Sequence, residues 1–216
     1  MKLEVDWSLY LVTDRLLSLG RPIDEIVLAA VDGGVTAVQL REKDCSTREF
    51  IALARQLKAL LAPRGVPLII NDRVDVALAA EADGVHIGQS DMTYRDARAL
   101  LGSRALIGVS VETPAQAQEA ESWDCDYLGV GPIFPSATKL DAAPAWGIAR
   151  FAELRQKSRR VLVAIGGLDA TNAGLLAAAG ADGIAVVSAI CSSPNPQAAA
   201  SRLCKSIADA CVRNSA

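Results

Sequence analysis

Aromatic side chains are scarce in this 216-residue chain, at 4%, whereas 51% of the residues are apolar. The apolar residues are therefore mostly Ala, Val, Leu and Ile, which suit buried parallel strands and closely packed helices. Single α/β barrel domains often have about 200–250 residues. We therefore expect one domain with one large core over residues 1–216.

Several features that would indicate other classes of protein are missing. The five cysteines are odd in number and lack CxxC spacing, which indicates neither a disulfide framework nor a zinc site. No apolar run reaches the roughly 18 residues that span a bilayer, and the N-terminus lacks a signal-like stretch. The net charge of −3, from 22 basic and 25 acidic residues, predicts no general affinity for nucleic acid or an anionic membrane. We expect a cytoplasmic protein and leave a homodimer open.

Short apolar runs alternate along the chain with longer helical patterns, which indicates right-handed βαβ units and a parallel sheet. Eight such repeats in this length favour a (β/α)8 TIM barrel, with an open eight-stranded sheet as the alternative. The expected strands are residues 7–13, 35–41, 67–71, 84–87, 106–111, 127–130, 161–165 and 183–187. The expected helices are residues 23–31, 47–61, 91–101, 114–121, 146–157, 171–179 and 197–212.

A weak internal echo supports this repeated unit. The sequence ADGV at residues 82–85 recurs as ADGI at residues 181–184, and CDYL at residues 125–128 is a fainter copy. Each copy opens one of the expected strands.

The catalytic groups of such barrels lie at the carboxyl ends of the strands. After the strand at residues 35–41, side-chain alternation places Gln39, Arg41 and Lys43 on one face. Long polar side chains are costly to bury without a partner, which favours an anion-binding face. The alternative is a solvated strand end in which Arg41 pairs with Glu42 or another acid.

Two aspartates follow neighbouring strands. Asp72 comes directly after the strand at residues 67–71, and Asp91 follows the strand at residues 84–87. Taken alone, either aspartate is at least as consistent with a helix cap as with a role in catalysis. Beside Arg41 and Lys43 they together predict a Mg²⁺–diphosphate site, because Mg²⁺ is commonly held by one or two carboxylates plus phosphate oxygens and waters.

Later strand ends add further polar groups. Ser110 alone is weak evidence for a functional site, because it could cap a helix. The Gly- and Pro-rich loop after residues 127–130 supplies Ser136, Thr138 and Lys139, which are residue types that contact phosphate, although it could be only a turn. The sole histidine, His86, is as consistent with an inward residue satisfied by hydrogen bonds as with a ligand contact.

The last two strands end in a Gly-Gly pair and in a Val-Ser pair. Glycine lets backbone N–H groups approach an anion, and the loops after the last two strands form the recurring phosphate site of this fold. Gly166 and Gly167 could also form only a tight turn.

Seven segments, taken in order, resemble the thiamine-phosphate synthase family and cover nearly the whole chain. They are YLVTD (10–14), QLREK (39–43), INDR (70–73), GVHIGQ (84–89) with Asp91, GVS (108–110), GVGPIFP (129–135) with Thr138-Lys139, and IGG (165–167). Family members commonly have Thr where this chain has Ser136.

The resemblance implies a transferase that joins two small phosphorylated substrates, a pyrimidine diphosphate and a thiazole phosphate. It assigns Arg41, Lys43, Asn71 and Lys139 to the diphosphate, Asp72 and Asp91 to Mg²⁺, and Gln39 and Ser110 to the pyrimidine or its leaving group. It assigns Ser136, Thr138, Gly167, Val187 and Ser188 to the thiazole phosphate. Of these residues, Arg41, Lys43, Ser110 and Lys139 are expected to be catalytic.

Three other functions fit the sequence less well. The related thiazole tautomerase has a His soon after the serine that corresponds to Ser110, whereas Val111 and Glu112 follow here. A phosphate sensor would need neither the two aspartates nor Lys139, and a sugar-phosphate isomerase would need a base that we cannot identify. The loops at residues 14–21 and 131–142 are candidate lids that exclude water.

Overall fold

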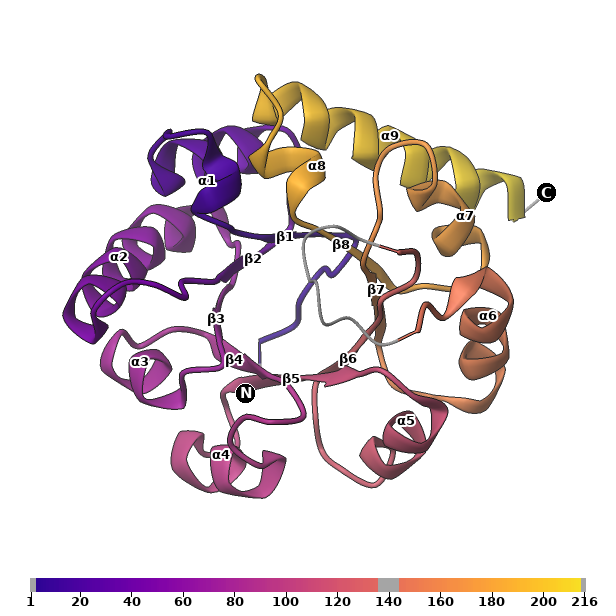
Figure 1. The fold of residues 1–216 in the computed structure, drawn as a ribbon, viewed down its shortest axis with the longest axis horizontal. Helices are drawn as coiled ribbons and strands as arrows, with labels where there is room; N and C mark the ends of the chain where they lie inside the picture. The colour runs from indigo at the N-terminus through magenta and orange to yellow at the C-terminus, as the bar shows by residue number, and fades with distance from the viewer. Residues whose placement is uncertain (1–2, 136–143, 215–216) are drawn as a thin grey trace.

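The computed structural model describes residues 3–135 and 144–214 and has a closed barrel of eight parallel strands at its centre (Figure 1). The strands follow one another in chain order, and the last pairs with the first at Leu9↔Ile184. This closure excludes the open sheet and confirms the predicted barrel. The strands are β1 (Leu9–Val12), β2 (Ala37–Leu40), β3 (Leu68–Asn71), β4 (Gly84–Ile87), β5 (Leu106–Val111), β6 (Tyr127–Val130), β7 (Leu162–Ile165) and β8 (Gly183–Val186).

The helices form a ring around the strands (Figure 1). They are α1 (Ile23–Asp32), α2 (Thr47–Leu61), α3 (Val74–Ala79), α4 (Tyr94–Leu101), α5 (Pro114–Ala120), α6 (Gly147–Lys157), α7 (Ala173–Ala178), α8 (Ser188–Cys191) and α9 (Pro196–Asn214), with 3-10 turns η1 (Leu16–Ser18) and η2 (Ala62–Arg64). The short helices α3 and α8 lie outside the helical ranges given above. Helix α4 begins later than predicted because Thr93 caps it, accepting the Asp96 N–H.

The strands are buried on both faces, as the alternation of their side chains requires. In β2, Val38 and Leu40 pack against the helices, whereas Ala37 and Gln39 lie inside the barrel. All four residues are buried. The predicted orientation of Gln39, opposite to Leu40, is therefore confirmed.

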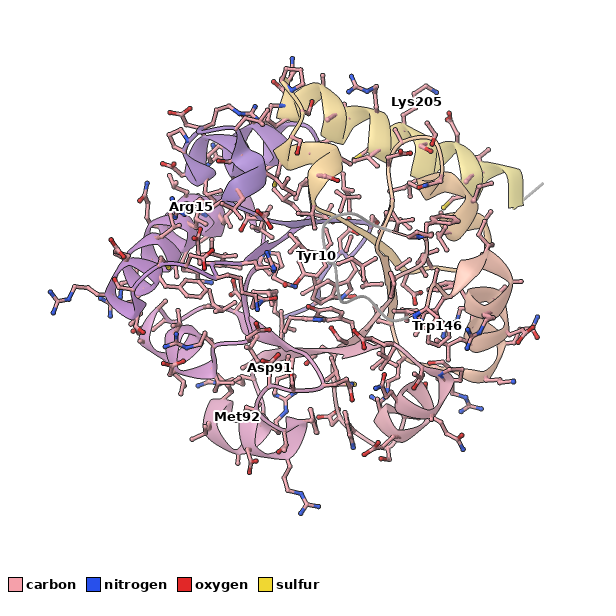
Figure 2. All side chains as sticks on the ribbon, in the orientation of Figure 1. Tyr10, Arg15, Asp91, Met92, Trp146 and Lys205 are labelled. Atoms are coloured by element: carbon pink, nitrogen blue, oxygen red, sulfur yellow. The ribbon has the colours of Figure 1, made fainter. Side chains whose placement is uncertain are left out.

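Aromatic rings fill the interior of the barrel. Trp7, Tyr10 and Tyr127 contact one another, with ring centroids 4.3–5.7 Å apart. Figure 2 shows Tyr10 in the middle of the ring of strands. The Tyr127 ring fits because β5 carries Gly108, where an added Cβ would lie 2.0 Å from the ring. Three of the nine aromatic residues thus lie where one large side chain fills the space of several small ones.

The internal echo in the sequence corresponds to one repeated structural device. Asp83, Asp126 and Asp182 each accept the backbone N–H at the start of the preceding strand, at 2.8 Å. Each also pairs with a cation from the helix that comes before that preceding strand, and these cations are Lys58 of α2, Arg98 of α4 and Arg155 of α6. Each aspartate thereby ties one helix to the amino-terminal end of the barrel.

Within the described parts of the chain, none of the helices combines the length and the apolar composition needed to cross a lipid bilayer.

Replacing Asp126 with Ala tests this device. Loss of the carboxylate leaves the Ile107 N–H without its acceptor, so we expect the free energy of unfolding to fall by about 1–3 kcal/mol. The neighbouring Asp124→Ala variant removes the same charge from an exposed position and should change stability by less than about 0.5 kcal/mol. Urea denaturation of both variants provides the measurement, and equal losses would contradict the assigned role.

Candidate active site

The carboxyl ends of β2, β3 and β4 bring the predicted cations and carboxylates together at one rim of the barrel. Lys43, three residues beyond β2, places its Nζ 2.6 Å from Oδ2 of Asp72, which directly follows β3. Asp91, which follows β4, shares a hydrogen bond with the Asp72 carboxyl group. Asn71 is the last residue of β3 and pairs in register with His86 of β4. The structure therefore gathers residues that lie up to 48 positions apart.

The two aspartates are held by local backbone structure, but neither caps a helix. Asp72 has a positive φ of 62°, and its N–H donates to the His86 carbonyl at 2.8 Å. Oδ2 of Asp91 accepts the Gly88 N–H at 2.7 Å. Helices α3 and α4 have Arg73 and Thr93 at their N-cap positions. The capping alternative for both aspartates is therefore wrong.

The two carboxyl groups differ in their affinity for protons. Burial raises the pKa of Asp72, but hydrogen bonds with Lys43 and Asp91 outweigh this effect and hold the pKa below its ordinary value. Burial and the hydrogen bond to Asp72 raise the pKa of Asp91 above its ordinary value. Asp91 therefore retains a proton more readily than an isolated carboxylate does, because of its burial first and of the adjacent Asp72 second.

This carboxylate pair has the donor chemistry that suits Mg²⁺, a cation that prefers oxygen and is often bound by one or two carboxylates. Across the two described stretches of chain, no three His, Cys, Asp or Glu side chains gather in a group able to hold a metal. Asp72 and Asp91 would therefore share the ion with oxygen atoms from a ligand or from water. A cation here would also relieve the repulsion that raises the pKa of Asp91.

Arg41 directly follows β2, at the same rim, and is held by the loop after β1. Its Nη1 donates to Oδ2 of Asp14 at 2.7 Å, while Oδ1 of Asp14 accepts the N–H groups of Leu16 and Leu17. Arg41 therefore pairs with an acid other than Glu42. Glu42 instead binds Arg15 through two hydrogen bonds.

The sequence interpretation assigned no role to Asp14, although it lies in the first motif. Asp14 and Arg41 are 27 positions apart, so only the folded chain reveals their contact. The loop that we expected to act as a lid contains the turn η1 and is tied to the rim by Asp14 and Arg15. Its closure stays a prediction.

Inside the rim, a chain of hydrogen bonds links β2, β1, β6, β4 and β5. Gln39 Nε2 donates to Tyr10 Oη at 3.0 Å, and Tyr10 Oη lies 2.8 Å from Tyr127 Oη. His86 Nδ1 lies 2.9 Å from Tyr127 Oη, and its Nε2 lies 2.8 Å from Ser110 Oγ. Both nitrogens of His86 thus have partners, as one reading of the sequence anticipated. Ser110 lies within β5 and caps no helix.

Removal from water controls the ionisation of this chain. Burial lowers the pKa of His86 to about 4, and the nearby Asp72 opposes the shift only weakly. Burial also raises the pKa of Tyr10 and of Tyr127 above their ordinary values. The imidazole and both phenols are therefore uncharged at neutral pH. No local pattern indicated that Tyr127 contacts His86 or that Tyr10 contacts Gln39.

The ends of β7 and β8 form the opposite side of the rim. Gly166 and Gly167 have positive φ values of 100° and 67°, and an added Cβ on Gly167 would lie 2.8 Å from the Phe134 Cβ. The Gly-Gly pair therefore forms a bend that packs closely against the loop after β6. Strand β8 ends at Val186, so Val187 is the N-cap and Ser188 the first residue of α8.

Three predicted site residues lie outside the described residues. They are Ser136, Thr138 and Lys139. Their assignment to substrate phosphates stays a prediction.

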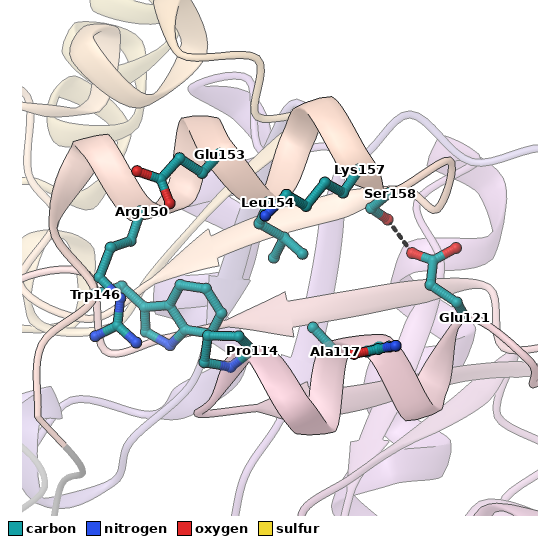
Figure 3. A pocket seen from close by; sticks show the side chains of 10 residues that line it. Pro114, Ala117, Glu121, Trp146, Arg150, Glu153, Leu154, Lys157 and Ser158 are labelled. Atoms are coloured by element: carbon teal, nitrogen blue, oxygen red, sulfur yellow. Dashed lines mark hydrogen bonds between the residues drawn. The ribbon is translucent and has the colours of Figure 1, made fainter.

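A separate groove of about 400 Å³ lies on the outer wall of the barrel between α5 and α6 (Figure 3). Its lining includes Arg150, which lies over the Trp146 ring at 5.3 Å, and Lys157. Ser158 donates a short hydrogen bond to Glu121 at one end of the groove (Figure 3). The groove includes none of the predicted site residues, so the rim remains the candidate active site.

Comparisons with known proteins show the family to which the chain belongs. A family model described as thiamine monophosphate synthase matches residues 9–190. The thiamine-phosphate synthase of Albidiferax ferrireducens is 53% identical over 195 residues, which cover 90% of this chain and 89% of that protein. That of Syntrophomonas wolfei is 51% identical over 185 residues, which cover 86% and 88%.

Solved structures show the same relationship. Thiamine phosphate pyrophosphorylase from Pyrococcus furiosus superimposes with a TM-score of 0.87 at 36% identity, covering 95% of this chain and 97% of that one. A 3-hexulose-6-phosphate synthase, at 19% identity and a TM-score of 0.68, shares only the fold. The extent of the family match and the identity to these relatives show that the chain belongs to the thiamine monophosphate synthase family, whose members are transferases.

Proposed function

We propose that this chain forms thiamine phosphate from 4-amino-2-methyl-5-pyrimidinylmethyl diphosphate and 4-methyl-5-(2-phosphoethyl)thiazole or its carboxylated form, releasing diphosphate. We further propose that residues 1–216 form one catalytic domain. The observation that carries the proposal is the cluster of Lys43, Asp72 and Asp91 beside Arg41 at one rim. It combines cations for a diphosphate with carboxylates for Mg²⁺ in a chain that belongs to this family.

Arg41, Lys43, Asn71 and Lys139 would bind the diphosphate. Arg41 and Lys43 are each held by an aspartate, so their positions are set before the substrate arrives. Asp72 and Asp91 would hold Mg²⁺, which supplies positive charge to stabilise the departing diphosphate. Preorganised charge of this kind is often the largest contribution to catalysis.

The bond changes need no general base. The carbon–oxygen bond to diphosphate breaks and its electron pair leaves with the diphosphate, while the thiazole nitrogen lone pair forms the new carbon–nitrogen bond. We propose a dissociative order, because the aminopyrimidine can spread positive charge from its exocyclic carbon. An uncharged His86, whose pKa is lowered to about 4, is consistent with a reaction that removes no proton.

The second substrate would lie on the opposite side of the rim. Ser136 and Thr138 would donate hydroxyl hydrogen bonds to the thiazole phosphate, and Gly167, Val187 and Ser188 would donate backbone N–H groups. Gln39 and Ser110 would contact the pyrimidine or its leaving group. Holding both substrates in line contributes through orientation, and excluding water protects the cationic carbon.

The tautomerase alternative lacks support at the rim. Ser110 is followed by Val111 and Glu112, so no histidine follows it to move a proton. His86 already hydrogen-bonds through both ring nitrogens. These features favour condensation over isomerisation.

Direct assay of the purified chain tests the proposed reaction. Incubation with both substrates and Mg²⁺ should give thiamine phosphate and diphosphate, detected by mass spectrometry, and neither should form when one substrate is omitted. Chelation should abolish product formation and added Mg²⁺ should restore it, because the carboxylate pair would otherwise repel the diphosphate. Undiminished turnover after chelation would contradict the metal assignment, and absence of product from the complete mixture would contradict the reaction.

Substitutions at the proposed diphosphate site should reduce turnover without unfolding the chain. We expect Asp91→Ala and Lys139→Ala each to lower kcat/KM by about 100-fold or more, because each removes a group that stabilises separated charge. Asp124→Ala and Lys157→Ala are matched controls, since both side chains are exposed and lie away from the rim. Circular dichroism should show unchanged folding. Near-normal kcat/KM in both site variants would refute the proposed site.

The contact of Asp14 with Arg41 can be separated from its role in the loop. Asp14→Asn keeps an oxygen for the Leu16 and Leu17 N–H groups but removes the ion pair with Arg41. We expect kcat/KM for the pyrimidine diphosphate to fall about tenfold, the effect of losing roughly 1.4 kcal/mol. Steady-state kinetics at saturating thiazole phosphate measures the effect. An unchanged kcat/KM would show that Arg41 needs no partner.

A further inference from the structure

The hydrogen-bond chain inside the barrel has a residue of the proposed pyrimidine site at each end, the buried Gln39 and, at the rim, Ser110. This interior chain comprises Gln39, Tyr10, Tyr127, His86 and Ser110, in that order, with each link between 2.8 and 3.0 Å. Gln39 and Tyr10 are buried, with exposed fractions of 4% and 1%. Ser110 lies one residue before the end of β5, at the rim. The interior chain therefore connects the core of the barrel to a hydroxyl group that faces the site.

The donors of the interior chain can be placed from its buried end. Gln39 Nε2 donates to Tyr10 Oη, so Tyr10 has its own hydrogen available for Tyr127, its second partner within the described residues. Tyr127 can then donate its single hydrogen to His86 Nδ1. A neutral imidazole that accepts at Nδ1 carries its hydrogen on Nε2. That hydrogen points to Ser110 Oγ, so the serine accepts from His86 and keeps its own hydrogen for a ligand.

If hydrogen bonds along the interior chain were donated in the opposite direction, Ser110 would be an acceptor toward a ligand. If the Gln39 amide were turned over, every hydroxyl would donate toward the core, and Ser110 would donate to His86 Nε2. Ser110 could then only accept from a ligand. Of the groups of the proposed substrate, only the 4-amino group could donate to such a serine, whereas the phosphate oxygens and the ring nitrogens need a donor, so this direction would not serve the diphosphate. The tautomer of His86 therefore decides what Ser110 can bind.

We infer that Tyr127 and His86 are positioning residues that turn the Ser110 hydroxyl into a hydrogen-bond donor toward the bound pyrimidine diphosphate. The inference deepens the proposed function and rests on it for the identity of the ligand. The direction of the interior chain is a property of the protein alone, and it can be measured without any substrate.

Packing holds the two rings in the positions that this role requires. Tyr127 and His86 are stacked, with ring centroids 5.4 Å apart. An added Cβ on Gly108 would lie 2.0 Å from the Tyr127 ring, and one on Gly129 would lie 2.9 Å from the His86 ring. Glycine at these two positions gives each ring its space, and the surrounding strands keep the rings from turning. A rigid donor needs no reorganisation when the ligand binds.

Nitrogen NMR tests the direction of the interior chain. Because the chain has one histidine, ¹⁵N-histidine labelling of the substrate-free protein gives a single imidazole. We expect long-range ¹H–¹⁵N correlations at neutral pH to show a neutral ring with the hydrogen on Nε2. A ring with its hydrogen on Nδ1, a doubly protonated ring or a mixture of tautomers would overturn the inference, whatever the enzyme assay shows.

Two phenylalanine variants locate the cause of the tautomer. Tyr127→Phe removes the hydroxyl that donates to Nδ1, so we expect the single Nε2–H form to become a mixture. Tyr10→Phe is the matched control, because it interrupts the interior chain one link earlier and leaves Tyr127 able to donate. We expect it to keep the Nε2–H form. A Tyr127→Phe spectrum identical to that of the parent would contradict the role of Tyr127.

A double-mutant cycle tests whether His86 acts through Ser110. Gln at position 86 can still present an N–H near the Nε2 position, whereas Leu cannot, and both lose the bond to Tyr127. We expect His86→Leu to have roughly tenfold lower kcat/KM than His86→Gln, with most of the loss in kcat. In a Ser110→Ala background this difference should vanish. The same difference in both backgrounds would show a purely structural role and overturn the inference.

Discussion

The space inside the closed barrel is the constraint on which the site depends. Eight parallel strands enclose a narrow interior, and each inward position on one strand must leave room for a side chain from another. Gly108 and Gly129 have no side chain, and this leaves room for the rings of Tyr127 and His86. The aromatic rings then fill the interior of the barrel below the rim. The polar atoms of the same cluster lie on the side of the rim. The limited space inside the barrel therefore determines both how the rings pack and how their polar groups are oriented.

Charge at the rim is balanced before any ligand arrives. Asp14 neutralises Arg41, which is partly buried, and Asp72 neutralises the exposed Lys43, so each cation already has a partner. Asp91 completes the set by sharing a hydrogen bond with Asp72. Such pairing holds the cations in place while keeping the rim stable, because an unpaired charge removed from water is costly. In the proposed function, the diphosphate would replace the aspartates as the negative partner of the two cations. The metal ion would replace Lys43 as the positive partner of Asp72.

Periodicity predicted the strands well, because strands buried on both faces leave continuous apolar runs between glycine, proline and polar residues. It missed α3 and α8, which have only six and four residues and are too short to show a helical pattern. The boundary at α4 was misplaced because Asp91 and Thr93 are both good helix caps, and only the backbone decides between them. The repeated aspartates were visible as a weak internal repeat in the sequence. Their hydrogen bonds with the backbone of the preceding strand were not predicted.

The sequence by itself determined the barrel, the family and the list of polar residues at the strand ends, because these depend on local order along the chain. Tertiary structure alone decided which of those residues meet. Lys43 pairs with Asp72, Arg41 with Asp14, and Ser110 with His86, over separations of 24 to 29 positions. Tyr10 and Tyr127, 117 positions apart, touch only because β1 and β6 face the same interior. The first three contacts arise from the pairing of neighbouring strands and the last from barrel closure, and neither leaves a local mark in the sequence.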